Sequence, residues 1–205
     1  MSPRTEDAYQ ALRDERSEQI LDAALKVFAT KGFEAAKITD IAESAGVSYG
    51  LVAHYFGKKE EIYAAVVAHA YDCALVMLEK ALVMPGTPWE RLTFVCSELL
   101  TRIRSFPETL DYLVLLNQVK TLKAIPAGAL ARVRSIEKKY LDIQVKLVKA
   151  GQESGEVVDG DPAELVIIFT SVIQGLSDRW TDEEERKRLQ KHFPSADTVL
   201  RLLKA

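Results

Sequence analysis

Apolar residues recur at helical spacing along most of the 205-residue chain. Between residues 17 and 30, for example, Ile20, Leu21 and Ala24 begin a series that continues three or four positions apart. This spacing places the apolar side chains on one face of a helix. Glycine and proline stand at the junctions between such stretches, where they end helices. Because no stretch alternates as a strand does, the sequence predicts an all-α protein.

The predicted helices differ in length along the chain. They span residues 17–30, 38–45, 48–56, 58–84, 89–105, 108–123, 127–154, 162–180, 182–192 and 196–204. Three short helices fall within the first 57 residues, and longer ones follow. We therefore expect an N-terminal three-helix domain at 1–57 and a larger helical bundle at 58–205.

Composition narrows the functional class. The formal net charge of −3 argues against a protein that coats nucleic acid without specificity, although a local DNA-binding face is still possible. The longest uncharged aliphatic stretch, 165–177, is shorter than the roughly 20 residues of a spanning helix, and the polar N-terminus does not resemble a signal peptide. Cys73 and Cys96 lie in apolar helical patterns, which favours reduced core residues in a cytoplasmic protein. With three histidines and no metal-binding motif, we expect no metal and no cofactor.

Residues 38–56 have the pattern of a helix-turn-helix. Gly46 permits the sharp turn, and Ser48 is a suitable N-cap for the second helix. Val47 and Val52 have the spacing of a hydrophobic staple. The expected inner face consists of Ile41, Ala42, Ala45, Val47, Val52 and Phe56. The second helix would then present Tyr49, Gly50, Ala53 and Tyr55 outward, a surface suited to close approach to a DNA groove.

The segment from about Arg16 to Tyr63 resembles the DNA-binding domain of TetR-family transcriptional repressors. The resemblance rests on the string ITDIAESAGVSYGLVAHYFGKKEEIY and on the preceding helix ILDAALKVFATKGFEAA. It implies that the second helix of the motif lies in the major groove of a palindromic operator. The residues it implies as DNA contacts are Lys37, Thr39, Ser48, Tyr49, Gly50, Leu51, Ala53, His54, Tyr55 and Lys59. Lys37 and Ala53 depart from the family, which commonly has Thr and Tyr at these positions. Arg4 and Arg13 fit either a minor-groove arm or a frayed helix end.

The resemblance also implies that the larger domain binds a small-molecule effector and forms a homodimer. The expected pocket residues are Cys96, Leu99, Leu100, Ile103, Leu113, Leu116, Asn117, Tyr140, Gln144 and Phe169. Because few cationic residues lie on the apolar faces, a largely hydrophobic effector is favoured. The dimer seam is expected on the helix 162–180, with a partner in the C-terminal region 196–203. Its predicted residues are Leu165, Phe169, Val172, Ile173, Gly175 and Leu176.

The resemblance implies a ligand-responsive, sequence-specific DNA-binding regulator, released from its operator by the effector. An enzyme is disfavoured, since no nucleophile–base pair, metal cluster or phosphate-binding loop is visible in the sequence. The alternative is a helical protein–protein adaptor that retains the helix-turn-helix as a scaffold. Binding to DNA is the measurement that separates the two.

Overall fold

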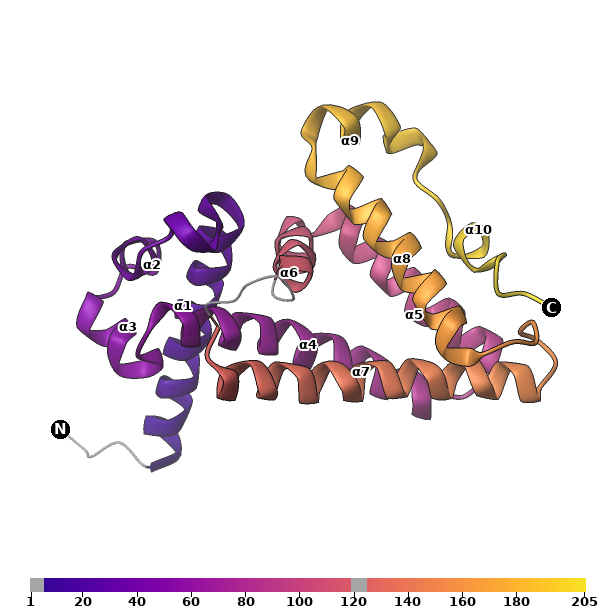
Figure 1. Cartoon of the computed structure of the whole chain (residues 1–205), viewed down its shortest axis with the longest axis horizontal. Coiled ribbons are helices and arrows are strands. Elements are labelled where there is room, and N and C mark those ends of the chain that lie inside the picture. Colours follow the sequence, from indigo (N-terminus) through magenta and orange to yellow (C-terminus); the bar gives the residue numbers. More distant parts are fainter. Residues whose placement is uncertain (1–5, 119–124) are drawn as a thin grey trace. The chain divides into compact units, whose positions relative to one another are not determined.

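The computed structural model describes residues 6–118 and 125–205, with all side chains in these ranges except those of 6–12, 107 and 117. Within the described ranges the regular structure is helical, and the one β-type pairing is an isolated antiparallel bridge between Val157 and Lys204. The predicted all-α fold, with a small helical motif followed by a larger bundle, is therefore confirmed (Figure 1).

The chain folds into two compact units that are not separated at a single point. Unit 1 consists of Met1–His69 and Leu115–Val133, and unit 2 consists of Ala70–Val114 and Arg134–Ala205. The sequence suggested a boundary after residue 57, whereas unit 1 continues into the following helix and includes a later segment. The boundary falls inside three helices, α4 (Lys59–Val83), α6 (Pro107–Gln118) and α7 (Ala127–Glu153).

Unit 1 is built around α1 (Glu6–Ala35), α2 (Ile38–Ser44), α3 (Tyr49–Phe56) and the first part of α4. The first helix was expected to stop at Gly32. Instead Gly32 takes a φ of 73° and a ψ of 163°, and a short helical segment follows this kink to Ala35. Arg13 lies within α1 and is exposed, whereas Arg4 lies outside the described residues.

Three aromatic rings fill the centre of unit 1. The ring centroids of Phe28 and Phe33 each lie close to that of Tyr63, at 5.0 Å and 5.2 Å. The Tyr63 hydroxyl donates a hydrogen bond to the carbonyl of Leu115 at 3.2 Å. Because burial disfavours the charged phenolate, it raises the pKa of Tyr63 well above its ordinary value. These contacts join α1, α4 and the returning segment into one core.

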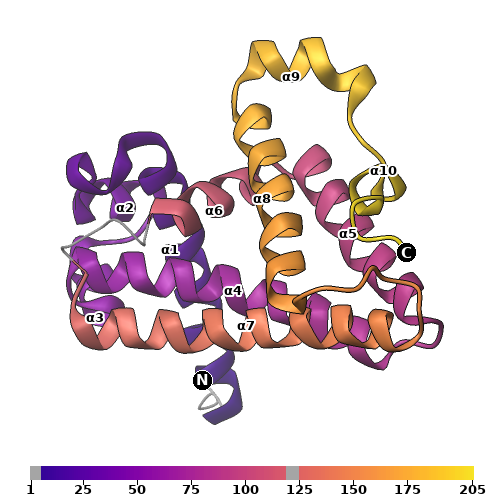
Figure 2. The ribbon, with the colours of Figure 1, turned by 45° about the vertical axis from the view of Figure 1, so that its right-hand side comes forward.

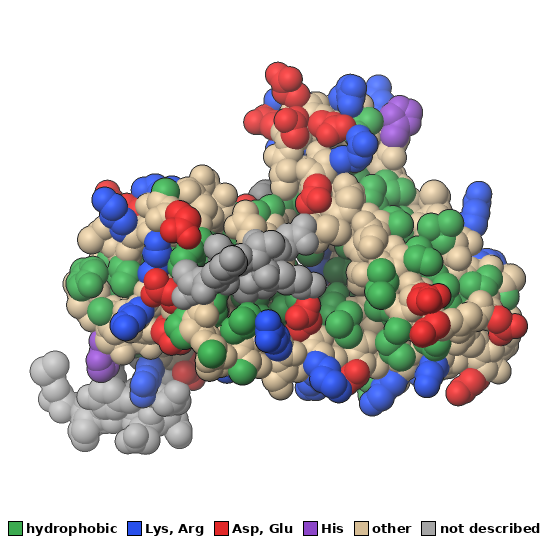
Figure 3. Space-filling model, viewed as in Figure 1, with side chains coloured by type: hydrophobic (Ala, Val, Ile, Leu, Met, Phe, Trp, Pro, Cys, Tyr) green, Lys and Arg blue, Asp and Glu red, His purple; other side chains and the backbone are tan. Residues whose placement is uncertain are grey.

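Unit 2 contains the remainder of α4, most of α6 and α7, and the elements that follow. Its other elements are α5 (Pro88–Ser105), α8 (Pro162–Thr181), α9 (Glu183–Leu189), the 3₁₀ helix η1 (Gln190–His192) and α10 (Ala196–Leu200). Helix starts agree with the local sequence: Thr87 caps α5 and Asp161 caps α8, each followed by a proline at the first helical position. In both ribbon views the later part of α4 runs beside α7 (Figures 1 and 2), where Glu79 and Lys139 form an ion pair at 2.7 Å. Acidic and basic side chains gather over α9 (Figure 3).

The C-terminal segment differs from its prediction. A helix was expected over 196–204, but α10 ends at Leu200. The following residues pair with the loop after α7: the amide of Val158 donates to the carbonyl of Leu203 at 3.0 Å, and the amide of Ala205 donates to the carbonyl of Glu156 at 3.2 Å. Leu200 and Leu203 are almost completely buried in unit 2. This segment is therefore part of the core of unit 2 and does not form a second long helix beside α8.

One helix in the described ranges, α4, is long and apolar enough by length and composition to cross a membrane. Within its most apolar window, 61% is buried inside the protein. A core helix of a folded protein passes the same test, so this feature does not indicate a membrane protein.

Candidate nucleic-acid interface and ligand cavity

The turn between α2 and α3 has the local geometry that the sequence predicted. Gly46 takes a φ of 64°, a conformation that side chains other than glycine rarely adopt. The amide of Val47 donates to the carbonyl of Ala42 at 2.9 Å, which closes the end of α2. The Ser48 hydroxyl accepts a hydrogen bond from the amide of Leu51 at 3.2 Å, so the predicted N-cap of α3 is confirmed. The two helices are thus joined as a helix-turn-helix.

The outer face of α3 is exposed to solvent and has open space at Gly50. Val52 is completely buried and anchors the helix, whereas 56% of Tyr49 is exposed. A Cβ atom added at Gly50 would meet no described atom within 4 Å. Ser48 and His54 are exposed as well, and Leu51, Ala53 and Tyr55 are half-buried. Ile41, Ala42 and Ala45 are buried as expected, but Val47 and Phe56 are only half-buried.

An acidic residue that the sequence analysis did not single out organises the start of α2. The amide of Lys37 donates to the Asp40 carboxylate at 2.9 Å, and the Lys31 ammonium pairs with the same carboxylate at 3.1 Å. Both partners hold the pKa of Asp40 below its usual value, and the Lys37 amide has the larger effect. An acid three residues after the N-cap is the sequence signal for this arrangement. The side chains of Lys37 and Thr39 are exposed beside it.

Lys59 has a structural environment that differs from the predicted phosphate contact. Its ammonium donates to the carbonyl of Phe33 at 2.7 Å and to that of Glu34 at 3.2 Å. It also lies over the Phe33 ring, 4.5 Å from the centroid. Two of its three donors are therefore used. Because Phe33 and Glu34 follow the Gly32 kink, these hydrogen bonds hold the end of α1. The neighbouring Lys58 is exposed.

A long-range hydrogen bond fixes the helix-turn-helix to α1. The Gln19 side chain donates to the carbonyl of Ala45 at 2.7 Å. Ala45 is the C-cap of α2, so this contact holds the residue next to the turn. Local sequence gives no signal for it, because the two residues lie 26 positions apart.

The family model of bacterial regulatory proteins, TetR family, matches residues 20–66, which contain all of this motif. The chain belongs to the TetR family. Over 90% of its length it is 27% identical to the fatty acid metabolism regulator protein of Bacillus subtilis, covering 92% of that protein. It is also 32% identical to the HTH-type regulator YfiR of the same organism, over 56% of each chain, so it spans about half the length of that relative. The resemblance of residues 16–63 to the DNA-binding domain of the TetR family is therefore confirmed.

Solved structures show that the TetR-family fold extends over nearly the whole chain. The regulator PfmR from Thermus thermophilus superposes with a TM-score of 0.69 at 23% identity, covering 91% of this chain and 99% of that one. A putative fatty acid metabolism regulator from Clostridium perfringens gives a TM-score of 0.68 at 17% identity, with the same coverage. As a TetR-family member, the protein is a DNA-binding transcriptional regulator.

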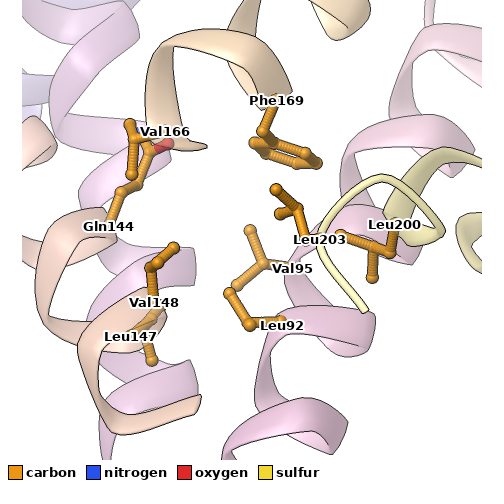
Figure 4. A pocket seen from close by; sticks show the side chains of 9 residues that line it. All are labelled: Leu92, Val95, Gln144, Leu147, Val148, Val166, Phe169, Leu200 and Leu203. Carbon is orange, nitrogen blue, oxygen red and sulfur yellow. The ribbon is translucent and has the colours of Figure 1, made fainter. Parts of the chain in front are cut away.

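Unit 2 encloses an apolar cavity between α5, α7, α8 and the C-terminal segment (Figure 4). The space among its side chains is small and opens in part to the surface. The lining residues are Leu92, Val95, Gln144, Leu147, Val148, Val166, Phe169, Leu200 and Leu203. Gln144 is the polar residue among them. It is 5% exposed, and neither its amide nitrogen nor its amide oxygen has a hydrogen-bond partner among the described residues.

The cavity includes two of the predicted pocket residues, Gln144 and Phe169. Of the others, Cys96, Leu100 and Ile103 belong to the buried core, against which Leu99, Leu113 and Tyr140 pack. Leu116 lies in unit 1, and the side chain of Asn117 lies outside the described residues. The remaining lining residues were missed. A signal existed for some of them, because Leu147 and Val148 follow Gln144 at helical spacing on α7.

The predicted dimer-seam residues of α8 have different environments. Leu165 and Ile173 are buried in the core of unit 2, so they offer almost no surface to a second copy. Phe169, Val172 and Leu176 are half-buried against the same core, whereas Gly175 is exposed. The large apolar side chains of α8 that are exposed are Ile167 and Ile168, at 62% and 45%. The five consecutive apolar residues from 165 to 169 are the signal that α8 is apolar on more than one face.

Within the described residues, no group of three or more His, Cys, Asp and Glu side chains is placed to hold a metal ion. Cys73 is exposed and Cys96 is buried, and neither forms a disulfide. Burial raises the pKa of the Cys96 thiol to about 12, with a smaller contribution from the negative charge of Asp197. Cys96 is therefore a protonated core residue at neutral pH.

Proposed function

We propose that the protein is a cytoplasmic, homodimeric repressor that binds a palindromic operator through α3 and leaves it when a largely apolar small molecule enters the cavity of unit 2. The observation that carries this proposal is the outer face of α3, which is capped, anchored by Val52 and open to approach at Gly50. A homodimer would present two such helices to major-groove segments one turn apart, about 34–36 Å.

Base contacts would come from the exposed side of α3. Tyr49 is placed to hydrogen-bond to a base or a phosphate, and Gly50 lets the helix backbone approach the groove. Leu51 and Ala53 would contact thymine methyl groups. Lys37, Thr39, Ser48, His54 and Tyr55 would contact phosphates, which fix the helix in register without reading sequence. Lys59 would support this surface by holding the end of α1.

Regulation would follow from differential binding. An effector releases DNA only if it prefers a conformation in which the two α3 helices no longer match the operator. Two relatives support this proposal by their names: a fatty acid metabolism regulator protein and KstR of Mycolicibacterium smegmatis, a transcriptional repressor that is 31% identical over 42% of this chain. A structural neighbour from Saccharomonospora viridis, 20% identical, was solved in complex with choline.

The proposed dimer would use the outer face of α8. Ile167 and Ile168 supply exposed apolar area there, and Ser171 and Gly175 are exposed small residues that permit close helix approach. The predicted seam is thereby shifted from Leu165 and Ile173, which face the core of unit 2. The C-terminal partner region is dropped because Leu200 and Leu203 are buried in the same core.

The test is selection of binding sites from a random double-stranded DNA pool at physiological salt, with the wild type, Tyr49→Ala and Tyr49→Phe in parallel. The wild type is expected to recover a palindrome. Tyr49→Ala should weaken specific binding by about 1–3 kcal/mol without unfolding the protein. Tyr49→Phe separates the hydroxyl from the ring, because it removes only the former.

Val83→Ala is the matched control, since Val83 is 83% exposed and belongs to unit 2. Its operator affinity should equal that of the wild type. If no palindrome emerges and the remaining weak binding disappears with added salt, the repressor proposal is wrong and a protein–protein adaptor becomes the better interpretation. If a palindrome emerges but Tyr49→Ala binds it normally, α3 is not the recognition helix.

A further inference from the structure

The cavity of unit 2 has an unusual polarity. Eight of its nine lining residues are Leu, Val or Phe, and the ninth is Gln144. A glutamine amide has two N–H donors and a carbonyl acceptor. When such a group is buried without partners, it loses its hydrogen bonds to water and gains none in return. In Figure 4 its amide lies beside Val166, among apolar side chains.

The side chains around Gln144 do not replace the hydrogen bonds that its amide loses on burial. Tyr140 lies close enough to Gln144 for that side chain to lower its pKa, although burial dominates and raises the pKa to about 12. No hydrogen bond of ordinary geometry joins the two side chains, however, and both polar atoms of Gln144 stay unpartnered among the described residues. This conclusion does not depend on which way the amide is oriented, because the nitrogen and the oxygen are both unpaired.

The charges around the cavity are also informative. None of the lining residues is charged. Arg91 stands next to Leu92 in the sequence; one of its terminal nitrogens donates to the carbonyl of Leu82 at 3.2 Å, whereas its buried Nε has no partner among the described residues. Asp197 is close enough to Cys96, the residue after Val95, for its negative charge to add to the rise in the pKa of that thiol. An anion entering this cavity would lose its hydration without meeting a cationic lining residue.

From these observations we infer that the ligand of this cavity is an uncharged molecule with an apolar chain and a terminal group that both donates and accepts a hydrogen bond to Gln144, such as a primary amide or an alcohol. The inference rests on the proposed function, whose effector it specifies. An ester offers only an acceptor, so it can bond to the N–H groups of the glutamine but leaves the carbonyl oxygen without a donor. A carboxylate offers acceptors and a charge that the cavity does not neutralise. The order of affinity follows as amide or alcohol first, then ester, then carboxylate.

A matched series of probes isolates the effect of the terminal group. Octanamide, 1-octanol, methyl octanoate and sodium octanoate form such a series. They share nearly the same apolar chain and differ in the terminal group.

The experiment is isothermal titration of the full chain at pH 7.5 with each of the four probes, for the wild type, Gln144→Leu and Val148→Ala. The wild type should bind octanamide and 1-octanol at least about tenfold more tightly than octanoate, with the ester between them. Gln144→Leu keeps the size of the side chain and should reduce this preference to less than about threefold. Val148 lines the same cavity without a polar atom, so Val148→Ala should change all four affinities by a similar factor.

Two results would overturn the inference. One is octanoate binding at least as tightly as octanamide to the wild type, and the other is an unchanged order of affinities in Gln144→Leu. A lack of binding by all four probes would overturn it as well. Titration of the same probes into the protein–operator complex separates this inference from the proposed function. If octanamide binds through Gln144 but leaves the DNA affinity unchanged, the ligand class stands and the proposed release from the operator is wrong.

Discussion

Lys58 and Lys59 are adjacent in the sequence but have different surroundings. Lys59 donates to two backbone carbonyls and lies over the Phe33 ring, whereas Lys58 is exposed. We expect Lys59→Ala to lower the free energy of unfolding by about 1–2 kcal/mol, because it leaves carbonyls at the end of α1 without their charged donor. Lys58→Ala should change it by less than about 0.5 kcal/mol. Urea denaturation followed by circular dichroism measures both free energies of unfolding. If the two variants lose the same stability, the hydrogen bonds of Lys59 do not stabilise the end of α1.

Gln144 gives a second prediction at the scale of one residue. Because its buried amide has no partner among the described residues, replacing it with leucine should stabilise the unliganded protein by about 1–3 kcal/mol. The same change should weaken binding of the proposed ligand. A melting temperature that falls in Gln144→Leu would show that the amide is already satisfied in the free protein.

At the scale of elements, two glycines of unit 1 should respond to alanine in opposite ways. Gly32 has a φ of 73° and no described atom near its Cβ position, so Gly32→Ala would introduce backbone strain alone. We expect it to destabilise the protein by about 1–3 kcal/mol, because a φ of 73° with a ψ of 163° lies in a backbone region that is essentially restricted to glycine. Gly50 is helical and equally open, so Gly50→Ala should stabilise α3 by up to about 1 kcal/mol while weakening operator binding. Thermal unfolding and DNA titration of both variants check this pair, and a destabilised Gly50→Ala would contradict it.

The outer face of α8 leads to a prediction on assembly. Ile168→Lys places a charge on the exposed apolar face and should convert the proposed dimer to a monomer at micromolar concentration. Val76→Lys is the control, because Val76 is 68% exposed on α4 and lies outside this face. Sedimentation velocity distinguishes the two states. If Ile168→Lys sediments like the wild type, the dimer does not use this face of α8.

The sequence predicts those elements whose causes are local. Gly46, Ser48, Pro88 and Pro162 fix helix ends by their own backbone preferences, so the turn and most helix boundaries agree with the structure. The C-terminal helix was overpredicted because its last residues pair with a loop far along the chain. The partners of Lys59 were invisible for the same reason. The cavity was found only in part, since its wall combines α5, α7, α8 and the C-terminal segment, and no local pattern shows how these helices are rotated toward one another.

At the scale of the whole molecule, acidic pH should destabilise both units. Asp40 in unit 1 has its pKa lowered mainly by the Lys37 amide, and Glu156 in unit 2 mainly by the Thr87 hydroxyl. A carboxyl whose pKa is lower in the folded state stabilises the fold above its unfolded pKa, here 3.8 and 4.5, and loses this contribution as the pH falls through the folded pKa. We therefore expect the melting temperature to fall below about pH 4.5 and to be insensitive to these two groups between pH 6 and 7. In Glu156→Gln the melting temperature should fall less steeply below pH 4.5. If its pH dependence is the same as in the wild type, this carboxyl does not contribute to the acid sensitivity.

The discontinuity of unit 1 bears on how the protein can be engineered. A fragment cut after residue 57 would lack Tyr63, which fills the aromatic core, and Leu115, whose carbonyl receives the Tyr63 hydroxyl. Hybrid regulators are assembled by grafting the DNA-reading part of one protein onto the sensor of another. In this chain the grafted segment must extend to His69. The recipient must also have, in the place of residues 115–133, a segment that packs against it. A graft that exchanges only the N-terminal stretch would transplant the reading helix without the residues that complete its core.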